Sequence, residues 1–208
     1  MLTSLSVADF LQEIASNSPA PGGGSVSALA ASLGAALTSM VCHLTIGKKK
    51  YADVQEEIEK TLKQSEELSV QFNAIIDEDT IAFNKVMVAY GLPKETEEQK
   101  AKRTAEIQIA IKMATVIPLK LMELCIEALE LVKILIIKGN QSSLSDTGVA
   151  ALMLHAGCEG AALNVKINLG SLSDADFVSQ TKTKVEHYRT SLETFSSDIL
   201  ASVNKQLK

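Results

Sequence analysis

Hydrophobic residues recur every three or four positions along most of this chain, a spacing that predicts helices rather than strands. The clearest stripe lies within residues 52–90 and consists of Val54, Ile58, Leu62, Leu68, Phe72, Ile75, Phe83 and Val86. Another helix begins at Glu97, and its stripe of Ile107, Ile111, Ala114 and Ile117 resumes after Pro118 and ends near Gly139. Because proline lacks a backbone N–H and its ring crowds the preceding turn, we expect Pro118 to kink this helix or to divide it in two.

Two helices are expected before these. A short one covers residues 6–16 and opens on a weak capping pattern, a serine followed three residues later by an aspartate. After a segment rich in proline and glycine, another helix begins at Ser25 or Ser27 and reaches about Ile46. This helix is apolar nearly all round, which is typical of burial in a core or a subunit interface. Its many Ala, Ser, Thr and Gly residues favour a buried helix over a membrane span.

Two further helices complete the pattern. The first is expected to be capped by Ser145 or Asp146 and to reach about Asn168, and the second covers residues 173–204. No internal repeat, low-complexity tract or linker divides the 208 residues. We therefore predict one all-α, multihelical domain over residues 1–208, built on long amphipathic helices.

Composition and charge narrow the class of protein. Hydrophobic residues make up 46% of the chain and charged residues 22%, which excludes a disordered protein. The net charge of −5 argues against a nucleic-acid partner, because phosphates require a basic face. The three cysteines lie far apart and are odd in number, so a reduced compartment without disulfides is expected. No signal peptide is visible, so we expect a cytoplasmic protein with no membrane partner.

The most unusual local feature is the loop Pro21-Gly22-Gly23-Gly24-Ser25. Glycines that open a helix can bring bare backbone N–H groups to an anion, with the helix dipole assisting. The alternative is a tight turn that lets two helices approach each other. Three consecutive glycines raise the entropy of the unfolded chain, which points to a reason beyond the turn, but the sequence leaves both readings open.

Asp79 is the most informative acidic residue. It falls on the apolar stripe of its helix, between Ile75 and Phe83, whereas its acidic neighbours Asp77 and Glu78 point elsewhere. A carboxyl group on a buried face must be paired, hydrogen-bonded or protonated, and such groups often have pKa values useful for proton transfer. A partly exposed acid bonded to a neighbouring helix end is the structural alternative.

The helix that follows Asn140 offers a second set of polar residues. One of its faces is polar at the ends and small in the middle, and carries Asp146, Ala150, Met153, Gly157, Ala161, Asn164 and Asn168. Such a face suits a groove for a flat ligand. Close helix packing over Gly157, with Asp146 as a cap, is the alternative that we favour, because caps are common.

Two other groups of residues have plain structural explanations. The basic corner Lys48-Lys49-Lys50 lies at the end of a helix, where the dipole favours cations, although it could also dock the carboxylates of a substrate. His155 and Cys158 have the spacing of a ligand pair, but no second pair accompanies them. We therefore interpret them as core residues and predict no metal site.

Taken together, these segments resemble the formiminotransferase-cyclodeaminase family of folate enzymes. The resemblance rests on an ordered set of motifs that spans nearly the whole chain: Pro19 to Val26, Gly47 to Lys50, Asp79, Ala82-Phe83, Leu92-Pro93-Lys94, Arg103, Val116-Ile117-Pro118, Gly139-Asn140, Ser145-Asp146 and Asn164 to Leu169. It implies an all-helical fold, a homodimer with a folate cleft near the subunit interface, tetrahydrofolate derivatives as substrates, and neither a metal nor a nucleotide cofactor.

The resemblance also suggests roles for the residues singled out above. Asp79 or Asp146 would move protons, and Lys48, Lys49 and Lys50 would meet the glutamate tail of the folate. The substrate would be held by the remaining members of the set, which are Gly22, Gly23, Gly24, Ser25, Asn140, Asn164 and Asn168. Positioning and acid–base chemistry would suffice for the reaction.

Two folate reactions need these same tools. A 5-formimidoyltetrahydrofolate cyclodeaminase closes the ring to 5,10-methenyltetrahydrofolate and releases ammonia, which implies a role in histidine degradation. A methenyltetrahydrofolate cyclohydrolase adds water to give 10-formyltetrahydrofolate. A domain without a fused transferase would need a separate formiminotransferase for the first reaction, yet Leu92-Pro93-Lys94 and Arg103 resemble the fused enzyme, so the sequence slightly favours the cyclodeaminase. A non-catalytic helical assembly protein is the alternative of another class.

Overall fold

The computed structural model describes residues 1–207 and contains helices but no strands within that range, which confirms the all-α prediction. The elements are η1 (Leu2–Ser4), α1 (Val7–Ile14), α2 (Gly23–Thr45), η2 (Lys49–Val54), α3 (Gln55–Tyr90), α4 (Glu97–Lys138), η3 (Gln141–Ser143), α5 (Leu144–Leu169) and α6 (Ala175–Gln206).

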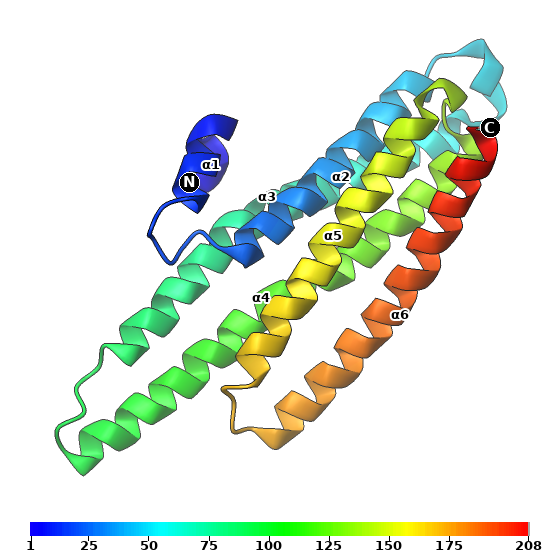
Figure 1. Cartoon of the computed structure of the whole chain (residues 1–208). Helices are drawn as coiled ribbons and strands as arrows, with labels where there is room; N and C mark the ends of the chain where they lie inside the picture. The colour runs from blue at the N-terminus through cyan, green and yellow to red at the C-terminus, as the bar shows by residue number, and fades with distance from the viewer. Residues whose placement is uncertain (208) are drawn as a thin grey trace.

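The five long helices run up and down along one common direction (Figure 1). α2 lies between α3 and α5, α4 packs against α3 and α5 on the other side, and α6 covers α4 and α5. The short α1 lies to one side, close to the start of α2, and the hairpin of α3 and α4 extends beyond the other helices at one end (Figure 1). The start of α2 therefore lies beside the middle of α3 rather than at its tip.

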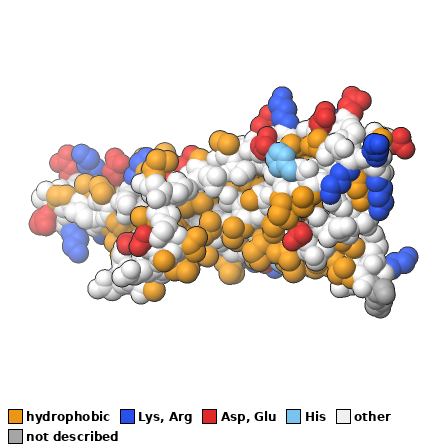
Figure 2. Space-filling view, turned by 90° about the horizontal axis from the view of Figure 1, so that it is seen from above, with side chains coloured by type: hydrophobic (Ala, Val, Ile, Leu, Met, Phe, Trp, Pro, Cys, Tyr) orange, Lys and Arg blue, Asp and Glu red, His pale blue; other side chains and the backbone are white. Residues whose placement is uncertain are grey.

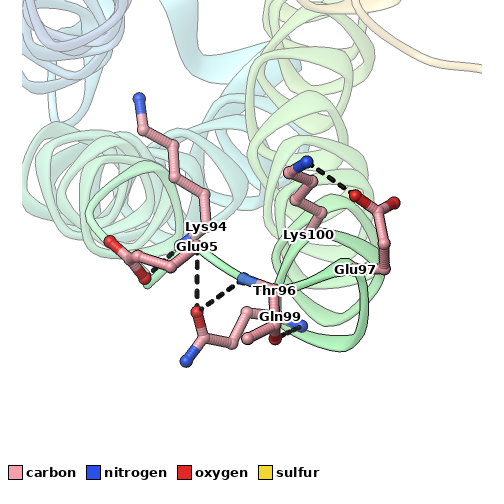
Figure 3. A network of polar contacts seen from close by, with 6 residues as sticks. All are labelled: Lys94, Glu95, Thr96, Glu97, Gln99 and Lys100. Atoms are coloured by element: carbon pink, nitrogen blue, oxygen red, sulfur yellow. Dashed lines mark hydrogen bonds and ion pairs between the residues drawn. The ribbon is translucent and has the colours of Figure 1, made fainter.

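Several helix starts follow ordinary capping chemistry. The Ser6 side chain accepts a hydrogen bond from the Asp9 backbone N–H, as the sequence predicts. α4 begins with a full capping box, in which the Thr96 hydroxyl accepts from Gln99 N and the Gln99 side chain accepts from Thr96 N (Figure 3). These bonds satisfy donors that have no partner within the helix, so the start of α4 is well defined.

Two predicted helix starts were wrong, and the division that was one of the two outcomes predicted at Pro118 does not occur. α2 begins at Gly23, two residues before the expected serine, because Gly22 serves as its N-cap. α4 is not divided at Pro118 and continues as one helix of 42 residues. α5 begins at Leu144, because a single 3-10 turn started by Asn140 leads directly into it, so Asp146 lies in the first turn and is not the cap.

The core lies where the long helices face one another. Its largest fully buried side chains include Phe72, Leu121, Met122, Leu154 and Leu192. Burying each such side chain contributes about 1.5–3 kcal/mol, which is the main term that holds the bundle together.

α2 and α5 approach each other closely because glycines line their contact. A Cβ atom on Gly34 would lie 2.7 Å from Leu154 Cγ, and one on Gly157 would lie 2.8 Å from the Ser27 carbonyl oxygen. The small face of α5 is therefore filled by α2 and forms no groove for a flat ligand. The packing interpretation of Gly157 is confirmed.

α2 and the segment 141–169 are long and apolar enough to cross a membrane by length and composition alone. About half of each apolar window is buried, 56% for α2 and 50% for the second segment, and the two helices pack against each other. The rest of their apolar surface faces outward. Figure 2 shows hydrophobic side chains over the middle of one face of the molecule, with charged side chains mainly toward its two ends.

Candidate functional site

Asp79 lies where the middle of α3 meets the first turn of α2. Its Oδ2 atom is 3.4 Å from Ser25 Oγ, and the Ser25 hydroxyl donates to the Ile76 carbonyl oxygen at 2.8 Å and lies 3.2 Å from Thr80 Oγ1. Ser25 is fully buried, whereas Asp79 is only partly buried. The carboxyl group is thus held beside the start of a long helix, but part of it stays accessible to a ligand.

The glycine loop makes room for this carboxyl group. A Cβ atom on Gly24 would lie 2.1 Å from Asp79 Oδ1 and less than 2.6 Å from the other carboxyl atoms, so any side chain there would displace Asp79. On the neighbouring turn, a Cβ on Gly23 would lie 3.6 Å from Asn164 Nδ2. The glycines therefore serve the close approach of side chains from α3 and α5 to the start of α2, which agrees with the interpretation of the loop as a turn that lets helices approach each other.

Burial raises the pKa of Asp79 above its ordinary value, because removal from water disfavours the charged carboxylate. Hydrogen bonding from the side chain and backbone of Ser25 opposes this rise. The positive end of α2 also favours the charged form. A carboxyl group held between these influences is suited to accept a proton and to return it, which is the requirement for general acid–base catalysis.

Asn164 and Asn168 are brought to the same end of the bundle by α5. Asn164 Nδ2 donates to the Gly160 carbonyl oxygen on its own helix at 2.8 Å, beside the glycine loop. Asn168 Nδ2 donates to the Ala114 carbonyl oxygen of α4 at 3.2 Å. In an unbroken helix that carbonyl would accept from the backbone four residues later, which here is Pro118 and has no N–H. Asn168 thus supplies the donor that proline removes, and it fixes α5 against α4.

The other predicted site residues lie at the opposite end of the helical bundle. Lys48 to Lys50 follow the end of α2, and the 23 residues of that helix span about 35 Å. Asp146 lies in the first turn of α5, about 27 Å along the helix from Asn164. The structure therefore brings together Gly22 to Gly24, Ser25, Asp79 and Asn164, and it separates them from the lysines and Asp146 within one chain. The roles suggested for the separated residues stay predictions.

Asn140 belongs to this distant group and is fully engaged in local contacts. Its Nδ2 donates to the Leu44 carbonyl oxygen at 2.9 Å, and its Oδ1 accepts from Ser142 N at 3.1 Å. Its backbone N–H donates to Thr45 Oγ1 at 2.9 Å, and Tyr51 Oη lies 3.4 Å from Oδ1. These bonds tie the end of α2 to the connection between α4 and α5, so Asn140 serves the fold in this chain.

A large apolar cleft of about 1060 Å³ lies between the projecting halves of α3 and α4. Its lining residues are Glu78, Ile81, Ala82, Asn84, Lys85, Val88, Ala89, Leu92, Lys102, Glu106, Ile109, Ala110, Met113, Val116 and Ile117. Glu78 and Ala82, which line the inner end of this cleft, are neighbours of Asp79 on α3, whereas Asp79 itself is not a lining residue. The sequence analysis missed this cleft, although a signal was present: Ile81, Val88, Ile109 and Met113 are apolar residues that lie off the main stripes and are exposed.

The remaining candidates for chemistry are structural. Within residues 1–207, no group of three His, Cys, Asp or Glu side chains lies close enough to hold a metal ion. His155 Nδ1 lies 3.1 Å from Ser196 Oγ of α6, and Cys158 is fully buried. Burial raises the pKa of Cys42 to about 12, which keeps its thiol protonated and unreactive.

Fold and site together define a class: an all-helical enzyme in which a partly buried carboxyl group, held against a glycine-opened helix, lies beside an apolar cleft. The chain belongs to the formiminotransferase-cyclodeaminase family, whose sequence model matches residues 6–187. The family resemblance found in the sequence is thereby confirmed, and the chain is an enzyme of folate one-carbon metabolism.

Three relatives place the chain within this family. The methenyltetrahydrofolate cyclohydrolase of Methylorubrum extorquens is 46% identical over 177 residues, which cover 85% of each chain. The formimidoyltransferase-cyclodeaminase of Rattus norvegicus is 35% identical over 202 residues, which cover 97% of this chain and 37% of the rat protein. The crystal structure of formiminotetrahydrofolate cyclodeaminase from Thermotoga maritima superposes over the full length of both chains, with a TM-score of 0.91 at 29% identity.

Proposed function

We propose that this chain is a methenyltetrahydrofolate cyclohydrolase in which Asp79 transfers the proton. The observation that carries the proposal is the position of the Asp79 carboxyl group, which is partly buried and lies against Gly24 at the start of α2. The identity of 46% to a cyclohydrolase, over 85% of both chains, supports this reaction over the cyclodeaminase that the sequence alone slightly favoured.

The chemistry needs one residue that both accepts and donates a proton. A water oxygen attacks the methenyl carbon between N5 and N10, and Asp79 accepts the proton that the water loses. The bond from that carbon to N5 then breaks as the remaining hydroxyl proton is released to solvent and the formyl C=O forms; N5 receives the proton held by Asp79, and 10-formyltetrahydrofolate leaves. The folate supplies the reacting carbon, so the proposal includes no metal and no nucleotide. Orientation in the cleft and proton transfer supply the acceleration.

The cyclodeaminase reaction is the second candidate. It is supported by the full-length likeness to the Thermotoga maritima cyclodeaminase and by the fused animal relatives. Here N10 of 5-formimidoyltetrahydrofolate attacks the formimidoyl carbon, Asp79 takes the proton from N10, and ammonia leaves with a proton. This reaction would place the chain in histidine degradation and would require a separate formiminotransferase.

The proposal includes a homodimer in the cytoplasm. α2 leaves uncovered a stripe that contains Val26, Leu33 and Leu44, and α5 leaves uncovered a stripe that contains Val149, Leu152, Leu163 and Ile167. The two helices lie side by side, so the stripes form one apolar face, which we name the α2–α5 face. A contiguous apolar face of this kind marks an association site, and a second copy of the chain presents a surface that matches it.

The deciding experiment follows the near-ultraviolet absorbance of methenyltetrahydrofolate with purified protein. Loss of absorbance faster than the protein-free control, with the 5-formimidoyl compound untouched, would establish the cyclohydrolase. Appearance of absorbance from the 5-formimidoyl compound would establish the cyclodeaminase. No change in either assay would contradict both and favour the non-catalytic helical assembly protein.

A further inference from the structure

The hydroxyl group of Ser25 lies between two acceptors on α3. It donates to the Ile76 carbonyl oxygen at 2.8 Å, and its oxygen lies 3.4 Å from Asp79 Oδ2. A serine has a single hydroxyl proton, so it can make one of these two bonds at full strength but not both. The bond to the carbonyl has the ideal length, whereas the distance to Asp79 is at the upper limit for a hydrogen bond.

The surroundings keep this hydroxyl group and the Asp79 carboxyl group together. Ser25 is fully buried, so its hydroxyl must find its partners within the protein. Gly22, the N-cap of α2, has no side chain to accept from the first turn, and the backbone of Ser25 hydrogen-bonds to Asp79 instead. The carboxyl group thus takes the place of a capping side chain, which holds it beside the Ser25 hydroxyl.

Thr80 adds a second hydroxyl group to this junction. Its Oγ1 atom lies 3.2 Å from Ser25 Oγ. A threonine in a helix often donates to the carbonyl oxygen four residues earlier, which here is that of Ile76, the acceptor that Ser25 already uses. If Thr80 donates to Ser25 Oγ instead, the Ser25 proton is left for either of its two acceptors.

The charged side chains of the elements around Asp79 are turned away from it or exposed. Asp77 accepts from Leu2 N at 2.6 Å, Lys112 of α4 pairs with Asp174, and Asp9 of α1 accepts from Ser6. The exposed ones are Glu13, Glu78, Lys120 and Lys166. The first turn of α2 carries no charged side chain. The hydroxyl groups are therefore the polar side chains best placed to respond to a proton on Asp79.

We propose that Ser25 is a positioning residue whose hydroxyl group changes its acceptor with the protonation state of Asp79. When the carboxyl group is protonated, Ser25 donates to the Ile76 carbonyl oxygen. When the carboxyl group is ionised, Ser25 donates to Asp79 Oδ2, and Thr80 donates to Ser25 in both states. This inference rests on the proposed function, because it takes Asp79 as the residue that transfers the proton.

A hydroxyl group is suited to this task because it can both donate and accept. A backbone N–H can stabilise only the ionised carboxylate, whereas a hydroxyl can also accept from the protonated acid. Asp79 would then keep the same position against Gly24 while its charge changes during the reaction. A proton-transfer group that stays in place needs no rearrangement between the two halves of the reaction.

The first test is a titration of Asp79 by carbon-13 NMR, with its carboxyl signal assigned by loss in Asp79→Asn. We expect Ser25→Ala to raise the midpoint by about one pH unit, because a hydrogen bond to the ionised form is lost. The Ile76 carbonyl carbon should titrate with the same midpoint in wild type, and should shift much less in Ser25→Ala.

Ser32→Ala is the matched control for this substitution. Ser32 is also a buried serine of α2 that bonds to α3, where it donates to Asn73 Oδ1 at 2.8 Å, but it does not contact Asp79. It should leave the midpoint of Asp79 unchanged. An equal rise in Ser32→Ala would show a general effect of loosening the α2–α3 contact and would overturn the inference.

A second pair of variants tests the part played by Thr80. Thr80→Val keeps the shape of the side chain but removes its hydroxyl, and it should raise the midpoint of Asp79 by less than Ser25→Ala does. Thr80→Ser keeps the hydroxyl and should restore the wild-type value. This pair also serves if circular dichroism shows that Ser25→Ala is not folded, in which case an unchanged midpoint in Thr80→Val would overturn the inference.

Kinetics then connect the titration to turnover. With whichever folate the wild-type protein converts, the acidic limb of kcat against pH should move up by about one unit in Ser25→Ala, so kcat on that limb should fall about tenfold. An unmoved limb and an unmoved midpoint would overturn the inference and leave the proposed function intact. If the protein converts neither folate but the midpoint still rises, the proposed function fails while the exchange of hydrogen bonds is supported, since NMR needs no substrate.

Discussion

At the scale of single residues, the site depends on the Asp79 carboxyl group, which occupies the space that a side chain at position 24 would otherwise fill. The periodicity of α3 places Asp79 on the buried stripe, and the structure shows why it is tolerated there: Gly24 leaves the space, and Ser25 supplies hydrogen bonds. The cost of this arrangement is a carboxylate that is partly removed from water, which raises its pKa. The burial that suits Asp79 to proton transfer therefore lowers the stability of the fold whenever the carboxyl group is charged.

Asp79→Asn should abolish turnover and leave the fold at least as stable. General acid–base residues contribute about 10²- to 10⁴-fold to rate, so kcat should fall by at least about 100-fold. Because the folded pKa is raised, the contribution of Asp79 to stability is full below its unfolded pKa and is lost as pH rises through the folded pKa. Thermal unfolding at neutral pH should therefore show an equal or higher Tm than wild type, and the difference should shrink in acid.

Asp198→Asn, a change of an exposed acid on α6, is the matched control and should alter neither activity nor Tm. A fully active Asp79→Asn protein would remove Asp79 from the mechanism. A clear loss of Tm at neutral pH would show that the carboxylate stabilises the fold, against the direction expected from its burial.

At the scale of elements, the glycine and proline positions decide how the helices meet. Gly34 and Gly157 allow α2 and α5 to pack backbone to backbone. Pro118 leaves α4 continuous only because its missing donor is replaced from another helix, where Asn168 reaches the Ala114 carbonyl oxygen. A local defect in one element is thus corrected by a side chain from its neighbour, and the correction also sets the register of α5 on α4.

The coupling between Pro118 and Asn168 can be measured with a double-mutant cycle in urea. Asn168→Ala should lower the free energy of unfolding by about 1 kcal/mol, because the Ala114 carbonyl loses its donor. In a Pro118→Ala background the restored backbone N–H can serve that carbonyl, so the same change should cost much less. Additive effects of the two substitutions would show that Asn168 does not compensate for the donor missing at Pro118, and Asn204→Ala on exposed α6 should be neutral in both backgrounds.

At the scale of the whole molecule, the bundle has two apolar surfaces with different expected partners. The α3–α4 cleft is concave, and its mostly apolar walls carry two lysines and two glutamates, which suits a small ligand. The α2–α5 face is an extended stripe whose exposed side chains are mostly aliphatic, which suits a second copy of the chain. Separate sets of polar residues lie near the two ends of α2: Asp79 and Asn164 near its start, and Lys48 to Lys50 and Asp146 near its end. The arrangement of the two copies in a dimer would determine whether the second set contributes to the site of the partner.

Leu33→Glu or Leu163→Glu should convert the protein to a monomer. Each change places a charge in the middle of the α2–α5 face, where an unpaired charge would be desolvated on association. Light scattering after gel filtration should show a dimer mass for wild type and for Ile137→Glu, an equally drastic change on the exposed side of α4. A wild-type protein that elutes at the monomer mass would contradict the dimer, and an unchanged dimer in both variants would assign it to another surface.

The sequence by itself determined the helical fold class, the approximate extent of the long helices, and the placement of Asp79 on a buried face. These features depend on hydrophobic periodicity and on capping, which are local properties of the chain. The ordered motifs were also sufficient to identify the family, because they depend on residue identity along the chain and not on geometry. The uninterrupted course of α4 was not predictable, since the donor that replaces the one missing at Pro118 comes from Asn168, 50 residues away.

Only the tertiary structure decided which polar residues share a site. The sequence grouped Asp79 with Asp146, Asn140 and three lysines, but α2 and α5 are long rigid helices whose two ends lie far apart, so the group divides into two. The purpose of Gly24 likewise appears only when α3 brings Asp79 against it. The cleft between α3 and α4 exists because these two helices extend beyond their neighbours. The lengths of the helices can be estimated from the sequence, but the surface that their projecting ends form depends on how the helices pack.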